Sequence, residues 1–147
     1  MTETAGPAPG YKDMPEHFVN FERSPKRIRV AFGGKTIVDT TDGLIVYERG
    51  HVPVYYFPRD DVAMDLLTGT DHSTHCPFKG DASYFTVNAG GQTAENAVWS
   101  YEQPFDEAAG LKDYLAFYWK KMDAWHEEDE EVFVVSKPAG LLTHGNN

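Results

Sequence analysis

The sequence predicts one mainly β domain, a small antiparallel β barrel or sandwich with one or two short helices. Nine Phe, eight Tyr and three Trp occur among its 147 residues, and aromatic side chains favour strands because they fit a pleated, half-buried surface. Short runs of alternating apolar residues are separated by glycine pairs, which is typical of hairpins. No long alternation of strands and helices occurs, so a dinucleotide-binding sheet is not expected. A chain of this length can bury a single core.

The sequence pattern divides the chain into three parts. Residues 1–25 contain four prolines and little apolar periodicity, which predicts an extended N-terminal arm. Residues 26–131 carry the strand patterns and are expected to form the β domain, and residues 132–147 are expected to be a C-terminal tail. Three aromatic side chains could fasten the arm to the core: Tyr11, Phe18 and Phe21.

The first half of the domain shows three strand signals. A hairpin is predicted over residues 28–39, where Gly33–Gly34 can supply the positive φ angles of a tight turn. Residues 44–50 and 52–59 are rich in β-branched and aromatic side chains, so each predicts a further strand. Residues 60–67 suit either a helical turn or a short strand, and both alternatives stay open.

The second half repeats the hairpin pattern. Two alternating runs flank Gly90–Gly91 and predict a second hairpin. Residues 106–114 predict a helix with Asp106 as its N-cap. The aromatic density of residues 114–119 favours a strand, and the acidic run at 126–131 is expected on a solvated edge.

Charge and composition exclude several kinds of partner. Thirteen Lys and Arg against 23 Asp and Glu give a net charge of −10, which opposes binding to nucleic acid or to an anionic membrane. No apolar run approaches the roughly 20 residues that span a bilayer. The first ten residues lack a signal-peptide pattern, and a single Cys allows no internal disulfide, so the expected location is the cytoplasm.

Residues 72–85, HSTHCPFKGDASYF, hold the most reactive side chains of the chain. Pro77 suits the second position of a type I turn, which would bring the Cα atoms of Cys76 and Lys79 within about 7 Å of each other. An ammonium group at that place stabilises a thiolate and would make Cys76 a nucleophile. In the alternative interpretation, Cys76 is a buried small hydrophobe.

Lys79 is a second candidate in the same stretch. It is the only Lys or Arg between Arg59 and Lys112, and it precedes Gly80, so it could hold a carboxylate or phosphate group. The phosphate-cradling pattern GxxxxGK[ST] is absent. In the alternative interpretation, Lys79 forms a salt bridge with a carboxylate close in sequence: Asp81, Asp71 or Glu95.

A metal site is a further hypothesis for the same stretch. Asp71, His72, His75 and Cys76 are ligand types that suit zinc. No second ligand pair with a standard spacing accompanies them, so histidines that cap turns are favoured and no metal is expected.

The run at residues 94–101 could form the wall of a pocket. Glu95, Ala97, Trp99 and Tyr101 share one face of a strand by its two-residue period, and Asn96 lies on the other. A carboxyl group desolvated among aromatic rings could act as a general acid or base. In the alternative interpretation, Trp99 and Tyr101 belong to the core.

Tyr56 and Arg59 add an aromatic ring and a second cation, and Arg suits bidentate binding of a carboxylate or phosphate. The candidate catalytic residues are Cys76 and Glu95, and the candidate ligand-binding residues are Tyr56, Arg59, Lys79, Gly80, Tyr84, Asn96 and Trp99.

Four blocks follow one another in the chain: GHVPVYYFPRDDVAMDLL, THCPFKGDASYF (74–85), AENAVWSYEQP (94–104) and YLAFYW. In their order and separation they resemble the DUF427 family of small bacterial and fungal proteins. The resemblance covers residues 27–131 and implies a single, mainly β domain with a site that includes Cys76, Lys79 and Glu95. The family has carried a nucleotidyltransferase label. The nearest carboxylates here, in residues 60–65, lack the arrangement that a metal-assisted transfer requires.

The function expected from these observations is the binding of a small molecule. An anionic or nucleotide-like ligand would lie in an aromatic pocket with Lys79 as its cation. An enzyme of transferase or hydrolase type that uses Cys76 or Glu95 is the first alternative, and a protein-interaction domain without a ligand site is the second. The sequence identifies neither a cofactor nor a partner protein.

Overall fold

The structure, a computed structural model, describes residues 4–133, so the expected tail from residue 134 onward lies outside the described residues. The described chain is mainly β, with three antiparallel sheets and only short helices, which confirms the predicted fold class. The sheets are arranged as a sandwich and not as a closed barrel. None of the helices in this described range is long and apolar enough to cross a membrane.

The strands are β1 (Val19–Arg23), β2 (Ile28–Phe32), β3 (Lys35–Thr40), β4 (Leu44–Glu48), β5 (Val54–Tyr56), β6 (Leu67–Cys76), β7 (Gly80–Ala89), β8 (Gln92–Tyr101), β9 (Leu115–Phe117), β10 (Ala124–Glu127) and β11 (Glu130–Val132). The helices are α1 (Gly10–Asp13) and the 3-10 turns η1 (Arg59–Asp61), η2 (Met64–Leu66), η3 (Asp106–Leu111) and η4 (Trp119–Lys121).

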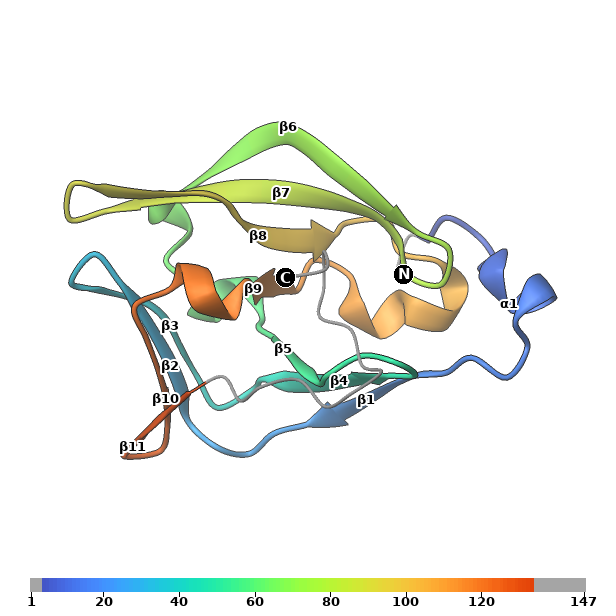
Figure 1. The fold of residues 1–147 in the computed structure, drawn as a ribbon, viewed down its shortest axis with the longest axis horizontal. Helices are drawn as coiled ribbons and strands as arrows, with labels where there is room; N and C mark the ends of the chain where they lie inside the picture. The colour runs from blue at the N-terminus through green and yellow to red at the C-terminus, as the bar shows by residue number, and fades with distance from the viewer. Residues whose placement is uncertain (1–3, 134–147) are drawn as a thin grey trace.

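Figure 1 shows how the three sheets are layered. The sheet of order β6-β7-β8-β9 lies above the sheet of order β1-β4-β5, and the sheet of order β11-β10-β2-β3 stands along one side. A bridge between Phe57 and Leu115 connects the segment after β5 to β9.

Both predicted glycine turns form, and they contact each other. Gly33 has a φ of 60° and Gly90 a φ of 58°, in the left-handed region that favours glycine. A Cβ atom on Gly33 would lie 2.1 Å from the carbonyl oxygen of Ala89, and one on Gly90 would lie 2.0 Å from the carbonyl oxygen of Gly33. The tips of the β2–β3 and β7–β8 hairpins therefore meet backbone to backbone, at the left of Figure 1.

Among the short elements, η1, η2, η3 and β9 lie where a helical turn or a strand was predicted, whereas β1, β10 and β11 were not predicted as strands. Residues 60–67 adopt the helical-turn alternative as η1 and η2 and then enter β6. The predicted N-cap at Asp106 is wrong, because Phe105 is the N-cap residue of η3 and makes no side-chain capping bond. Asp106 lies in the first turn, where its carboxylate accepts a hydrogen bond from Thr4.

Two clusters of buried side chains fill the interior. The first is aliphatic and aromatic and includes Val98, which packs with residues of β2, β3 and β10. The second, here named the aromatic cluster, contains Tyr56, Tyr84, Trp99 and Tyr101, each at most 2% exposed. Trp99 and Tyr101 are therefore core residues, as the alternative interpretation of that run holds.

Residues 4–23 contact the β domain along most of their length. Strand β1 pairs with β4, and Phe21 packs against the aromatic cluster. Residues 4–18, named the arm below, precede that strand and contact the β6–β7 turn and η3, where the backbone N–H of Gly10 donates to Pro77 and that of Asp106 donates to Gly6. Figure 1 shows the arm and α1 at the end of the molecule where this turn lies.

Candidate functional site

The structure distributes the predicted site residues over three places. Tyr84, Glu95 and Asn96 line a surface hollow, above Trp99 and Tyr56. Cys76, Lys79 and Gly80 lie at the β6–β7 turn, close to the arm. Arg59 lies on the opposite face of the β6–β9 sheet. The turn residues do not line the hollow, so the hollow and the turn are separate sites.

The hollow has a volume of about 300 Å³. Three strands, β6, β7 and β8, converge on it together with η4 and its N-cap residue, and each contributes polar side chains. The residues that line it are His72, Tyr84, Glu95, Asn96, Tyr118 and Lys121.

The hollow opens where two strands of the sheet are irregular. The pairing of β6 with β7 breaks between Gly69 and Ser73, so β6 bows away from its neighbour, as Figure 1 shows. The pairing of β7 with β8 shifts between Phe85 and Val87. Such bulges redirect side chains and often occur beside functional sites.

Asn96 occupies the bulge of β8 with a φ of 48°, a conformation that Asn tolerates better than most residues. Its backbone N–H donates to the hydroxyl of Thr86 (3.1 Å), and its side-chain oxygen accepts a hydrogen bond from Thr70 (2.6 Å). Because the oxygen is engaged, the amide NH₂ group is the end of Asn96 that can donate to a ligand.

Because of the bulge, the prediction that Glu95, Ala97, Trp99 and Tyr101 share one face of β8 is wrong. Ala97 packs in the first core cluster, whereas Trp99 belongs to the aromatic cluster, so the two-residue period does not extend through the bulge. Glu95 is exposed at the rim of the hollow and is not desolvated among rings. A strand bulge has no signature in the two-residue pattern, so sequence reasoning could not find it.

Two phenols form the wall beside Asn96. The hydroxyls of Thr74 and Tyr84 are 2.9 Å apart. Burial raises the pKa of Tyr118, and its hydrogen bond with Tyr84 raises it further. Tyr118 is therefore a neutral hydroxyl at neutral pH, and its proton is engaged with Tyr84.

The floor of the hollow is the aromatic cluster. The rings of Trp99 and Tyr118 lie 4.8 Å apart, and the indole N–H of Trp99 donates to the hydroxyl of Tyr56 at 3.0 Å. Both Trp99 and Tyr56 are almost fully buried, so they support the lining residues from beneath.

Lys121 is the cation of the hollow. Its ammonium donates to the backbone carbonyl of Glu95 (2.9 Å) and lies 5.2 Å from the centre of the Tyr118 ring. The ring of His72 meets that of Tyr84 edge to face at 4.5 Å. Tyr118 and Lys121 were not predicted from the sequence, and His72 was expected to cap a turn, with metal binding as the alternative, because no local pattern connects these residues.

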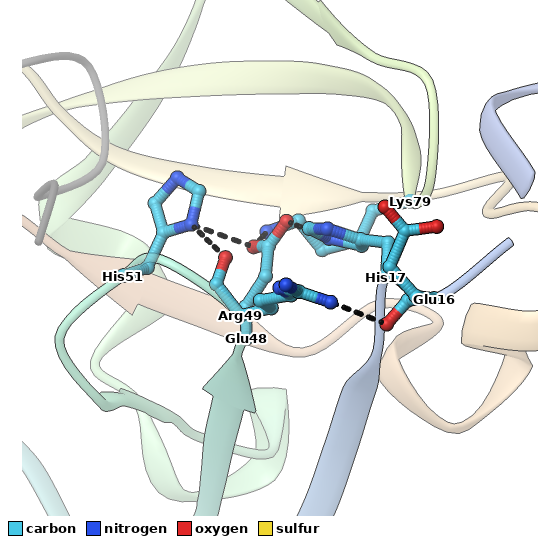
Figure 2. A network of polar contacts seen from close by, with 6 residues as sticks. All are labelled: Glu16, His17, Glu48, Arg49, His51 and Lys79. Carbon is cyan, nitrogen blue, oxygen red and sulfur yellow. Dashed lines mark hydrogen bonds and ion pairs between the residues drawn. The ribbon is translucent and has the colours of Figure 1, made fainter. Parts of the chain in front are cut away.

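Lys79 lies in a buried ion network away from the hollow. Its side chain is 8% exposed and that of Glu48 is 6% exposed, and the ammonium contacts the Glu48 carboxylate directly. His17 of the arm reaches the other oxygen of Glu48, with 2.9 Å between Nε2 and Oε2. Figure 2 shows these three side chains converging from the arm, the end of β4 and the β6–β7 turn. The expected salt bridge of Lys79 to Asp81, Asp71 or Glu95 is therefore wrong, because its partner comes from β4.

The charges of this network support one another. Burial by itself would raise the pKa of Glu48, but the charge of Lys79 and its hydrogen bond outweigh that effect and hold the pKa below its ordinary value. Burial likewise opposes the charge on Lys79, and attraction to Tyr56 and Glu48 raises its pKa above the ordinary value. The pair is therefore ionised at neutral pH.

The other two predicted residues of the turn have different surroundings. Cys76 is half-buried at the end of β6, opposite Gly80 in the pairing with β7. Gly80 has a φ of 126°, and a Cβ atom there would lie 3.3 Å from the backbone of Gln103 and Pro104. His75 pairs with Asp81 on the surface at 2.7 Å. Nowhere in residues 4–133 do three His, Cys, Asp or Glu side chains form a group that could hold a metal ion.

Arg59 is bound by the protein itself. It donates to the carbonyl of Asp113 (2.7 Å), to the hydroxyl of Ser100 (3.0 Å) and to the carboxylate of Glu102 (3.0 Å). Ser100 is the neighbour of Trp99 along β8, and successive side chains of a strand point to opposite faces. Arg59 therefore lies across the sheet from the hollow.

The fold and these contacts define a class of protein: an antiparallel, sandwich-like β domain with an aromatic cluster at its centre. The model of the family described as "Domain of unknown function (DUF427)" matches residues 20–128, and the chain belongs to this family. The match confirms the resemblance seen in the sequence. A search of the curated proteins finds no match. The matched residues include both the hollow and the Glu48–Lys79 pair, whereas the arm precedes them.

Proposed function

We propose that the hollow binds a small anionic or nucleotide-like molecule. The observation that carries the proposal is the convergence of an ammonium, an imidazole, two phenols, an amide and a carboxylate on about 300 Å³ of open space. Ligand sites typically combine apolar walls with a few fixed polar groups. Here the aromatic cluster supplies the rigid support and the bulge of β8 presents the polar groups.

Each lining residue has a role that its contacts support. Lys121 is exposed and can turn its ammonium from the Glu95 carbonyl towards a phosphate or carboxylate. The amide of Asn96 can donate a hydrogen bond to the same ligand, and the neutral hydroxyl of Tyr118 can accept one from it. The carboxylate of Glu95 can accept a hydrogen bond from a sugar hydroxyl or an amine.

The position of the cation differs from the one expected from sequence. Lys79 is neutralised by Glu48 and does not line the hollow. Lys121 and His72 take over that role in the proposal, while Trp99 and Tyr56 act as supports.

The test is a titration of isotope-labelled protein followed by nuclear magnetic resonance, with AMP, adenosine and inorganic phosphate as probes. We expect saturable shifts of the lining residues, largest with AMP. The variant Lys121→Gln should bind AMP about tenfold more weakly, because a hydrogen bond to a charged group is lost. Lys120→Gln is the matched control, since Lys120 is also exposed and adjacent but does not line the hollow.

Two results would overturn the proposal. The first is the absence of saturable shifts at the hollow with all three probes. The second is an equal loss of affinity in Lys120→Gln and Lys121→Gln, because it would show attraction to surface charge in general and not to this site.

A further inference from the structure

The ring of His17 is held in a slot made by residues of the domain. It stacks on the ring of Phe78, with centroids 3.7 Å apart and planes 18° from parallel. One edge of the imidazole faces Glu48, at 2.9 Å. Glu48 is in turn paired with Lys79, so the slot has a flat aromatic wall and a carboxylate at one end, as the orientation of His17 and Glu48 in Figure 2 illustrates.

The arm closes the slot by contacts of its own. Tyr11 meets the Phe78 ring edge to face at 5.0 Å. A Cβ atom on Gly10 would lie 2.6 Å from the Phe78 ring, so only a glycine allows the arm to approach this closely. The exclusion of water makes the hydrogen bond between His17 and Glu48 stronger than it would be on the surface.

The slot and its occupant belong to different parts of the chain. Glu48, Phe78 and Lys79 lie inside the residues that the family match covers, whereas His17 precedes them. None of the residues of α1 is buried, and within the described residues four backbone–backbone hydrogen bonds join the arm to the domain, donated by Ala5, Gly10, Arg49 and Asp106. The arm can therefore leave the domain without disturbing a strand of the sheets.

Stability alone does not account for these charges. A buried ion pair contributes little net stability compared with well-packed apolar side chains of the same volume. The centre of the Tyr101 ring lies 5.9 Å from the Lys79 ammonium, and the buried hydroxyl of Tyr101 has no hydrogen-bond partner within the described residues. Polar groups arranged in this way suit the recognition of a ligand that supplies its own hydrogen bonds.

We infer that Glu48, Phe78 and Lys79 form a second binding site, separate from the hollow, for a planar nitrogen heterocycle that carries an N–H group, and that His17 occupies this slot as an internal ligand. A nucleobase and free imidazole both have the required shape and donor. Phe78 stacks on the ring and Glu48 accepts the hydrogen bond. A ligand of this class binds by displacing the arm.

The first experiment empties the slot in the full-length protein. In His17→Ala, imidazole and adenine should each raise the melting temperature in a saturable way, because a ligand that binds only the folded state stabilises it. His126→Ala is the control, since His126 lies on β10 and has no contact with the slot. If His17→Ala does not fold, His17→Asn is the replacement, because it keeps a hydrogen-bond donor for Glu48.

Two further measurements separate a recognition site from a simple cavity. 1-Methylimidazole, used at a pH well above about 6.5 so that its ring is neutral, has no N–H group and should bind His17→Ala about tenfold more weakly than imidazole does. Adding Glu48→Gln or Phe78→Leu to His17→Ala should lower the affinity for imidazole by a similar factor. Equal binding of the two imidazoles, or binding unaffected by both second changes, would overturn the inference.

The last measurement uses the unmodified protein. Lys12 lies in α1 and is exposed, so trypsin can cleave after it when the arm leaves the domain. At the adenine concentration that saturates His17→Ala, cleavage after Lys12 should become faster. An unchanged rate would show that such a ligand does not displace His17, and it would refute the internal-ligand role. These results are independent of the AMP titration, which reports on the hollow.

Discussion

Replacement of Lys79 by Met should destabilise the protein strongly. The side chains of Lys79 and Glu48 are 8% and 6% exposed, so water hardly screens their attraction. Met keeps the length of the lysine stem but leaves the Glu48 carboxylate buried without its cation. Removal of one partner of a buried ion pair typically costs about 3–5 kcal/mol of the free energy of unfolding.

That loss converts into a large shift of the melting temperature. For a chain of 147 residues the entropy of unfolding is about 0.3 kcal/mol/K. The melting temperature of Lys79→Met should therefore fall by about 10–16 °C, as measured by differential scanning calorimetry or circular dichroism. Lys26→Met is the matched control, because Lys26 is 56% exposed and lies 3.6 Å from Glu127. We expect it to change the stability by no more than about 0.5 kcal/mol.

A double variant tests the explanation itself. Removing both charges in Glu48→Leu and Lys79→Met leaves no uncompensated buried charge, so most of the lost stability should return. If Lys79→Met melts within a few degrees of the unmodified protein, or if the double variant is as unstable as the single one, the reasoning about the buried pair is refuted.

Two further predictions concern the loss of stability at low pH and the contact between the hairpin tips. The pKa of Glu48 is held below its ordinary value in the folded state. The contribution of Glu48 to the free energy of unfolding is therefore fully present above the pKa that it has in the unfolded chain, and it is lost as the pH falls through its lower pKa in the folded protein. Urea titrations should therefore show a steeper loss of stability below about pH 4.3 in the unmodified protein than in Glu48→Gln, and parallel curves would contradict this. Gly90→Ala should lower the melting temperature more than Gly91→Ala, because a Cβ on Gly91 meets no atom within 4 Å whereas one on Gly90 overlaps the backbone of Gly33. Equal effects of the two changes would show that the hairpin tips do not need this contact.

The sequence by itself determined the elements whose causes are local. The glycine pairs at residues 33–34 and 90–91 predict the hairpins because few other residues adopt positive φ angles. Alternation and aromatic density predict most strands, and the order of the motif blocks identifies the family. Strand β6 carries neither signal, since it is exposed along most of its length, and it was not predicted.

Only the tertiary structure decided which side chains act together. Glu48 lies 31 residues from both His17 and Lys79, so no periodic pattern could pair them. The bulge at Asn96 turned Glu95 to the surface, and the packing of η4 against β8 brought Lys121 to the same hollow. The physical reason is that periodicity reports the local backbone, whereas ion pairs and pockets depend on the packing of segments that are distant in the chain.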